Sequence, residues 1–346
     1  MREMVQGKCA ILTSFLDAIR SMIKIARTQS AATRTFGSFA SASGRNDEMH
    51  SRFKTYRGLA SSLAVRLVHL PATILVTIIL LGLNALPQYD SQQSGMSANE
   101  LVRNVVANEL KSQADDHRHW MYRLEKEESG RKQVQEILET SSGSLARLLS
   151  INGRALDAKQ QQQESQRTQR LVSHPEEQRK LQQASNKKAE QGARLFRLLP
   201  DEFVFRYARS QGDLVTLTFR PNPNFQPSSL EARVFHCMEG EMTVDAKQER
   251  LAEINGHLME DVKFGGGLLG HLDKGGQFHV TQAEVAPGHW EMTFLSVDMK
   301  GKALLFKTIG AHETENHSDF HRVSDDLTLA EALGILNTQI VVADNR

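Results

Sequence analysis

Residues 289–313 read HWEMTFLSVDMKGKALLFKTIGAHE and form the clearest β-hairpin pattern in the chain. Trp290, Met292 and Phe294 alternate with charged and small residues, which is typical of a strand that buries one face. A turn at residues 300–301, Lys-Gly, would reverse the chain into a second strand. The alternation predicts that the three large side chains share one face of a sheet and that this face points inward.

Comparable strand patterns precede this hairpin. Residues 117–156 contain three alternating runs, and residues 198–264 contain several more, including a strand expected over residues 232–238. The runs are separated by turn dipeptides, which we place at 129–130, 142–143, 152–153, 212–213, 239–240 and 246–247. The count of runs predicts roughly ten or eleven strands, mostly paired in sequence order.

Helices are fewer in the expected fold. A capping box at Ser97 introduces a helix over residues 97–115, and residues 328–338 predict a helix near the C-terminal end. Residues 157–195 are dominated by Gln, Lys, Arg and Glu, so we expect an insert of two polar, solvent-exposed helices. The predicted fold class is therefore α+β. It is a strongly curved antiparallel sheet, an unclosed barrel with a few covering helices, in one domain over residues 97–338.

A sheet of this kind predicts a cavity. The apolar face of an antiparallel sheet must be covered, and few helices are available to cover it. We therefore expect an apolar cavity between the sheet and the first helix, of a kind that suits lipid chains. Aromatic side chains on the alternating runs are the candidates for its lining: Trp120, Tyr122, Phe235, Phe278, Trp290, Phe294 and Phe306. Each of them is also compatible with an ordinary packed core.

The N-terminal part of the chain sets the expected compartment. Residues 1–66, a basic leader expected to be largely disordered, carry eleven Lys and Arg against four Asp and Glu, whereas the rest of the chain carries 31 against 37. Residues 67–86 contain no charged side chain other than one His and are long enough to span a bilayer as a helix. Basic residues before such a run stay in the cytoplasm, so we expect the remainder to be periplasmic. The run fits either a cleaved signal peptide or an inner-membrane anchor.

Catalytic and metal motifs are weak. The chain has no HExxH, CxxC or GxSxG pattern and no P-loop. His117 with His119, and His317 with His321, supply too few converging ligands for zinc. We therefore expect no catalytic residue, no metal and no cofactor. The exported part is acidic and the net charge of the whole chain is +1, which argues against nucleic-acid binding.

Two phrases in the strand region carry a family resemblance. Residues 239–245 read EGEMTVD and residues 250–256 read RLAEING. With the leading helix and the strand meander, they resemble periplasmic lipoprotein-carrier domains of the LolA/LolB type. The resemblance covers residues 97–335 without the polar insert, which departs from the family pattern. It implies an unclosed barrel with a lid and a fatty-acyl cavity, and hence lipid or an acylated lipoprotein as the partner.

Three functional hypotheses remain open at this point. A carrier, or a lipid-binding module fixed to the membrane through residues 67–86, would hold acyl chains in a large apolar cavity. A structural or partner-binding periplasmic domain would have a filled core. An envelope hydrolase, for example a glycosidase with two carboxylates, would have titratable side chains that converge in a polar cleft.

The expected export can be tested with a reporter. A phosphatase fused after Gly95 is expected to be active in intact cells. The basic leader should stay in the cytoplasm, and the chain that follows the apolar run should be exported to the periplasm. A reporter that works only in the cytoplasm should be inactive at the same position. The opposite pair of results would show that the chain after Gly95 stays inside.

Overall fold

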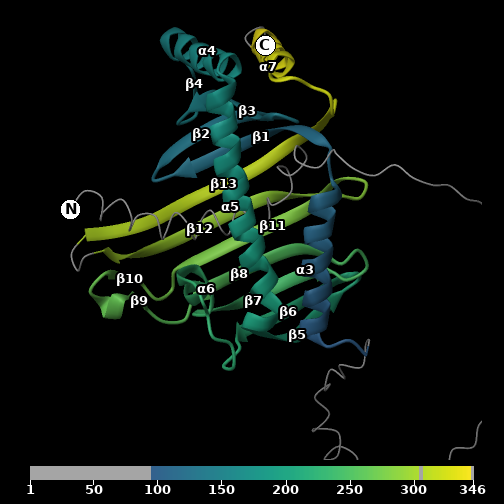
Figure 1. The fold of residues 1–346 in the computed structure, drawn as a ribbon, viewed down its shortest axis with the longest axis vertical. Coiled ribbons are helices and arrows are strands. Elements are labelled where there is room, and N and C mark those ends of the chain that lie inside the picture. The colour runs from purple at the N-terminus through teal and green to yellow at the C-terminus, as the bar shows by residue number, and fades with distance from the viewer. Residues whose placement is uncertain (1–94, 304–306, 344–346) are drawn as a thin grey trace, which may run out of the picture. The chain divides into compact units, whose positions relative to one another are not determined.

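The computed structural model describes residues 95–303 and 307–343, which form an α+β fold around one large antiparallel sheet (Figure 1). The apolar run 67–86 and the candidate Phe306 lie outside the described residues. Among the described helices, none is both long and apolar enough to cross a membrane.

The described part of the chain contains thirteen strands in this sheet. Ten of them are long, as the alternating runs predict, and three have only two or three residues. Their bounds are β1 His119–Glu128, β2 Arg131–Thr140, β3 Gly143–Ile151, β4 Arg154–Ala155, β5 Phe203–Gln211, β6 Leu214–Pro221, β7 Met238–Asp245, β8 Arg250–Leu258, β9 Val262–Phe264, β10 Gly270–Leu272, β11 Gln277–Ala286, β12 His289–Ala303 and β13 Lys307–Val323.

The strands follow the order β4-β3-β2-β1-β13-β12-β11-β8-β7-β6-β5, and β10 pairs with β12 and β9. Neighbours in sequence are mostly neighbours in space, and every pairing is antiparallel. The last strand, β13, lies between β1 and β12 and joins the two halves of the meander. Because β4 and β5 remain edges, the sheet is unclosed, and the predicted fold class is confirmed.

The helices have the bounds α3 Ala98–Asp115, α4 Ala158–Ser173, α5 Pro175–Glu202, α6 Leu230–Phe235 and α7 Leu329–Ala343, and a 3-10 turn covers Gly265–Gly267. The Ser97 side chain accepts a hydrogen bond from the backbone N–H of Glu100, so the expected N-terminus of the first helix is confirmed. The last helix begins after Thr328, whose hydroxyl accepts from the N–H of Glu331.

The hairpin turn predicted at residues 300–301 is wrong. Strand β12 continues to Ala303, and within it Gly301 pairs with Ile309 of β13. A Cβ atom on Gly301 would lie 2.2 Å from the backbone oxygen of His271, because the short strand β10 pairs with β12 at this position. The glycine is therefore needed for the close approach of a third strand and not for a reversal of the chain.

The turn predicted at residues 239–240 is wrong for the same reason. Gly240 lies inside β7, where a Cβ atom would be 2.0 Å from the backbone oxygen of Asn255.

The strand expected over residues 232–238 is also wrong, since most of this segment belongs to α6. The Ser229 side chain caps that helix by accepting from the N–H of Ala232. Phe235 is consequently a helical residue.

The other predicted turns agree with the structure. Those confirmed are at 129–130, 152–153, 212–213 and 246–247, and the one expected at 142–143 lies one residue earlier.

A β-bulge divides the predicted aromatic face of β12. The pairing of β11 with β12 shifts by one residue between Met292 and Phe294. Met292 and Leu295 are consequently both buried in the main core, whereas the ring of Phe294 lies edge-on against His279. Trp290 is half-buried. The prediction that all three side chains share an inward face is therefore wrong for Phe294.

Helices α3 and α5 lie over the same face of the sheet (Figure 1). Val102 and Val105 of α3, and Phe196 and Leu199 of α5, are buried in the main core with side chains of strands β5 to β12. The C-terminal turns of α5 are thus a core element rather than a solvated insert. The amphipathic part of the helix begins at Gly192, where the Gln- and Lys-rich composition ends.

A second apolar cluster covers the other face of the sheet near its β4 edge. Met121, Leu138 and Leu145 are cross-strand neighbours on β1, β2 and β3. They pack against α7, and Leu171 and Val172 of α4 join the cluster. The insert is helical, as expected, but its first helix contributes to a core despite the polar composition.

Asn99 protects the edge strand β5. Its amide nitrogen donates to the backbone oxygens of Pro200 and Phe203, and its amide oxygen accepts from the N–H of Phe205. The side chain therefore occupies backbone groups that a further strand would otherwise pair with.

A buried ion pair fixes α3 to the sheet. Glu109, which is 1% exposed, accepts from Arg250 Nε at 2.9 Å, from its Nη2 at 3.0 Å and from the backbone N–H of Leu251 at 2.8 Å. The guanidinium carbon of Arg250 also lies 5.7 Å from the ring centroid of Trp290. All donors of the Glu109 carboxylate come from the start of β8, so the helix cannot shift along the sheet without breaking them.

Removal of Arg250 tests this anchor. Arg250→Met leaves the Glu109 carboxylate buried without its charged partner, and we expect unfolding free energy to fall by about 3–5 kcal/mol. Arg209→Met is the matched control, because Arg209 also forms a two-fold contact with a carboxylate, Glu241, but at an exposed site. The control should leave the unfolding free energy nearly unchanged, because both charges of this exposed pair are in contact with water. Equal losses in urea titrations of the two variants would contradict the anchoring role.

Candidate functional site

A cavity of about 800 Å³ lies on the sheet face beneath α3 and α5. Its walls come from the last turns of α3, the connection to β1, strands β1 and β2, the start of β12 and the middle of α5. A volume of this size is within the range of small-molecule binding sites. The cavity differs from the predicted one, because charged and hydrogen-bonding side chains form much of its wall.

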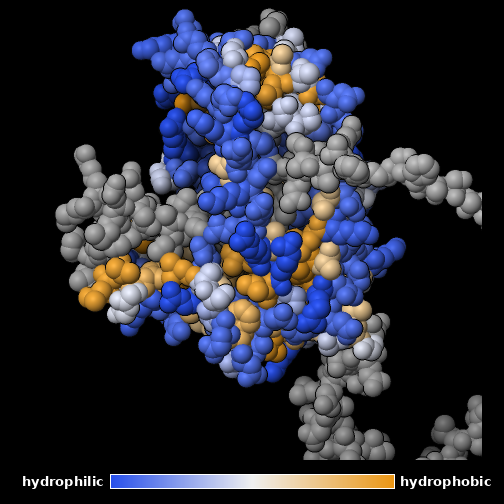
Figure 2. All heavy atoms as spheres, viewed as in Figure 1, coloured by the Kyte–Doolittle hydropathy of each residue, from blue (hydrophilic) through white to orange (hydrophobic). Residues whose placement is uncertain are grey.

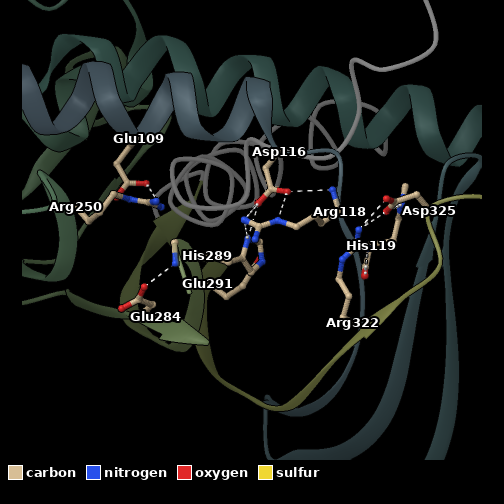
Figure 3. A network of polar contacts seen from close by, with 11 residues as sticks. Glu109, Asp116, Arg118, His119, Arg250, Glu284, His289, Glu291, Arg322 and Asp325 are labelled. Atoms are coloured by element: carbon tan, nitrogen blue, oxygen red, sulfur yellow. Dashed lines mark hydrogen bonds and ion pairs between the residues drawn. The ribbon is translucent and has the colours of Figure 1, made fainter. Parts of the chain in front are cut away.

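Four charged side chains form a continuous chain on this wall (Figure 3). Arg118 donates to the Asp116 carboxylate from Nε at 2.9 Å and from Nη2 at 2.8 Å. Asp116 Oδ2 lies 2.5 Å from Nδ1 of His289, and His289 Nε2 lies 2.9 Å from Oε1 of Glu291. Both ring nitrogens of His289 therefore face carboxylates.

Three chain segments place these residues. Asp116 is the C-cap residue of α3, and its N–H donates to the backbone oxygen of Ser112. Arg118 precedes β1, and His289 and Glu291 occupy alternate positions at the start of β12, on one side of the strand. The ring of Trp120 stacks on that of His289 with 4.4 Å between centroids. The end of a helix and the starts of two strands thus converge at one histidine.

The charge of His289 follows from these contacts. The ring is only 4% exposed, and burial by itself lowers a histidine pKa, but contacts with Asp116 and Glu291 outweigh this effect and raise the pKa above its ordinary value. Burial likewise opposes ionisation of Asp116, while hydrogen bonds from His289 and Arg118 hold the pKa of this carboxyl well below its usual range. The contacts with the two carboxylates therefore favour the imidazolium form of this ring relative to an exposed histidine.

A second part of the wall carries Trp290. Its indole Nε1 donates to the side-chain oxygen of Gln248 at 3.1 Å, and its ring lies beside the Arg250 guanidinium described above. These contacts hold an aromatic face at the cavity while Arg250 stays paired with Glu109. On β2, Glu139 also lines the cavity and accepts from the backbone N–H of Trp120.

The wall also includes the charged or titratable side chains of Lys111, Asp115, His117, His119, Lys188 and Asp325. Its remaining polar groups are hydroxyls and amides. They can donate and accept hydrogen bonds without carrying charge. These side chains are Asn108, Ser112, Gln113, Thr140, Ser144, Gln182, Ser185 and Gln282.

The structure separates the predicted lining residues. Tyr122 and Trp290 line the polar cavity, and Trp120 lies behind His289. Phe235 and Phe278 instead belong to the main core, where they border a void of about 20 Å³ with other apolar side chains. Phe294 lies beyond the bulge, outside both sites, and Phe306 is outside the described residues.

The sequence reading missed the central residues of the site, Asp116, Arg118, His289 and Glu291. The run DDHRHW at residues 115–120 is visible in the sequence, but by itself it suggests only possible metal ligands. Within the described residues, no group of three or more His, Cys, Asp or Glu side chains is arranged to hold a metal ion. The partner of this run, His289, is more than 160 positions away, and no local signal connects the two.

Comparison with family models, with curated proteins and with solved structures gives no match for this chain. The resemblance to lipoprotein carriers therefore remains a prediction.

The His289 network makes a prediction about pH. A raised histidine pKa contributes stability that is fully present below the unfolded-state value of 6.5 and is lost as pH rises through the folded-state value. His289→Gln should therefore destabilise the protein most near pH 5–6, by about 3 kcal/mol, with a smaller deficit at higher pH. Urea titrations across this range measure the difference.

His257→Gln is the control for this experiment, because His257 is half-exposed and lies 3.5 Å from the Glu239 carboxylate. It should change the unfolding free energy by less than about 1 kcal/mol at each pH. A deficit for His289→Gln that grows with rising pH would contradict the assigned charge state.

Proposed function

We propose that this protein is a binding module that holds an uncharged polar molecule, or the polar part of an amphiphile, in the cavity beneath α3 and α5. The observation that carries the proposal is the cavity of about 800 Å³, whose wall combines aromatic, hydroxyl and amide groups with charged side chains that are paired around Arg250 and His289. The export predicted from residues 67–86 belongs to the same proposal and would give the module a periplasmic ligand.

The charged groups around Arg250 and His289 are paired with each other, which favours an uncharged ligand in this part of the cavity. Arg250 is matched by Glu109, and the cations Arg118 and His289 are matched by the carboxylates of Asp116 and Glu291. A ligand with a strong net charge would have to compete with these short contacts. A ligand with hydroxyl and amide groups would instead use the dipoles that the wall supplies.

The aromatic side chains of the wall restrict the chemical class of the ligand further. Trp290 and Tyr122 supply flat apolar faces beside polar groups, and such rings suit ligands that are apolar on one side and polar on the other. Saccharides with acetamido groups have this character. Binding without turnover is the simpler function, because both nitrogens of His289 are engaged by protein carboxylates, which leaves neither of them for proton transfer with a ligand.

Acyl-chain binding is the second candidate. The main core contains a void of about 20 Å³ whose lining is entirely apolar, including Phe235, Met238 and Phe278. This space holds less than one acyl chain, so such a ligand would have to displace side chains, most simply by movement of α6. The lipid and lipoprotein partner expected from the sequence stays a proposal on this basis.

Ligand-dependent stabilisation separates the two candidates. We expect N-acetylglucosamine oligosaccharides to raise the melting temperature of the full chain and palmitate to leave it unchanged, since a ligand stabilises the state that it binds. At one hundred times the dissociation constant, the expected stabilisation is about 2.7 kcal/mol. The reverse result would favour the acyl-chain site.

Trp290→Ala and Phe294→Ala form a matched pair for this test. Both remove an aromatic ring from β12, but only Trp290 lines the cavity. Trp290→Ala should abolish the oligosaccharide response, and Phe294→Ala should retain it. Equal responses in the two variants would show that the ligand binds elsewhere and would reject the proposed site.

A further inference from the structure

A second surface of the protein is independent of the cavity. Leu268 is 70% exposed and Leu269 is 48% exposed, and they are the only adjacent pair among the large apolar side chains that the described residues expose. They lie in the connection between β9 and β10, where Figure 2 shows hydrophobic atoms gathered at one extremity of the sheet. Neither leucine belongs to a described apolar cluster.

The backbone holds these leucines outward. Gly265, Gly266 and Gly267 all have positive φ angles, between 56° and 92°, which residues with a side chain adopt only at a cost. The N–H of Leu268 donates to the backbone oxygen of Gly265, and that of Leu269 donates to the backbone oxygen of Phe264. A Cβ atom on Gly265 would lie 2.6 Å from Leu269, so the loop is closed tightly behind the exposed pair.

Basic side chains stand beside this loop. Lys263 of β9 and Lys302 of β12 are both in direct register with His271 of β10, so the three side chains form one cross-strand row. Both lysines are exposed, and neither has an ion pair within the described residues. His271 lies 3.1 Å from the Asp273 carboxylate, which leaves the row with a positive excess. Like charges in register repel, and an anionic surface would relieve that repulsion.

We propose that the loop Gly265–Leu269 inserts Leu268 and Leu269 into a lipid bilayer while Lys263 and Lys302 contact anionic head groups. A single weak anchor binds a bilayer only marginally, whereas an apolar anchor combined with a basic patch gives stable attachment, and this end of the sheet supplies the two together. None of these loop and strand residues lines the polar cavity.

A local probe tests the proposal in the full chain. Residues 67–86 can themselves enter a bilayer, so total binding to vesicles is not informative. Leu268→Cys in a Cys9→Ser, Cys237→Ala background places a single thiol on the loop, and it is labelled with a nitrobenzoxadiazole dye. Leu214→Cys, a 42% exposed leucine at the start of β6, is the matched control.

With vesicles of phosphatidylcholine and phosphatidylglycerol, the dye at 268 should brighten and shift to the blue, whereas the dye at 214 should not respond. Removal of the charges in Lys263→Gln and Lys302→Gln should weaken the response about fivefold for each lysine. A higher salt concentration should also weaken the response of the dye at 268.

Three outcomes would overturn the proposal. One is a dye at 268 that stays in water with anionic vesicles, and another is a response of equal strength with pure phosphatidylcholine. The third is a blue shift that depends on protein concentration and needs no vesicles, which would assign the leucines to a contact between protein molecules.

Discussion

The pairing of β13 with both β1 and β12 is the constraint on which the rest of the structure depends. It connects the first three long strands to the later meander, although more than 150 residues separate β1 from β13 in the chain. It also places the start of β1 near the start of β12. The contact of Asp116 with His289, the pairing of Arg118 with Asp116 and the stacking of Trp120 on the His289 ring all require this arrangement.

Uneven coverage of the sheet explains why a polar cavity exists. The helical residues that are apolar, at the start of α3 and the end of α5, fill the face over β5 to β12. The polar part of α5 then crosses the region where β1 and β12 start, and its one large apolar side chain, Leu181, is 55% exposed and does not fill the space. Ion pairs stabilise the walls there instead. Glu109 with Arg250 marks the boundary between the packed core and the cavity.

The glycines show where sequence patterns mislead. Gly240 and Gly301 look like turn residues, yet both lie inside strands where a neighbouring backbone leaves no room for a Cβ atom. The glycines at 265–267, by contrast, do form a tight turn with positive φ angles. Glycine serves both purposes, and only the position of other strands decides between them. The bulge beside Phe294 has the same origin, because it depends on the pairing partner rather than on the residue itself.

The sequence by itself determined the fold class, the helix that follows Ser97, most hairpin turns and the helical insert, because short-range periodicity and capping encode these features. Tertiary structure alone decided which aromatic side chains reach a cavity and what chemistry surrounds them. Phe235, which the sequence pattern predicts on a strand, lies in a helix and is buried in the main core. His289 contacts Asp116, in a segment more than 160 residues away in the chain. Contacts between distant segments depend on strand order and register, which no local pattern of side chains specifies.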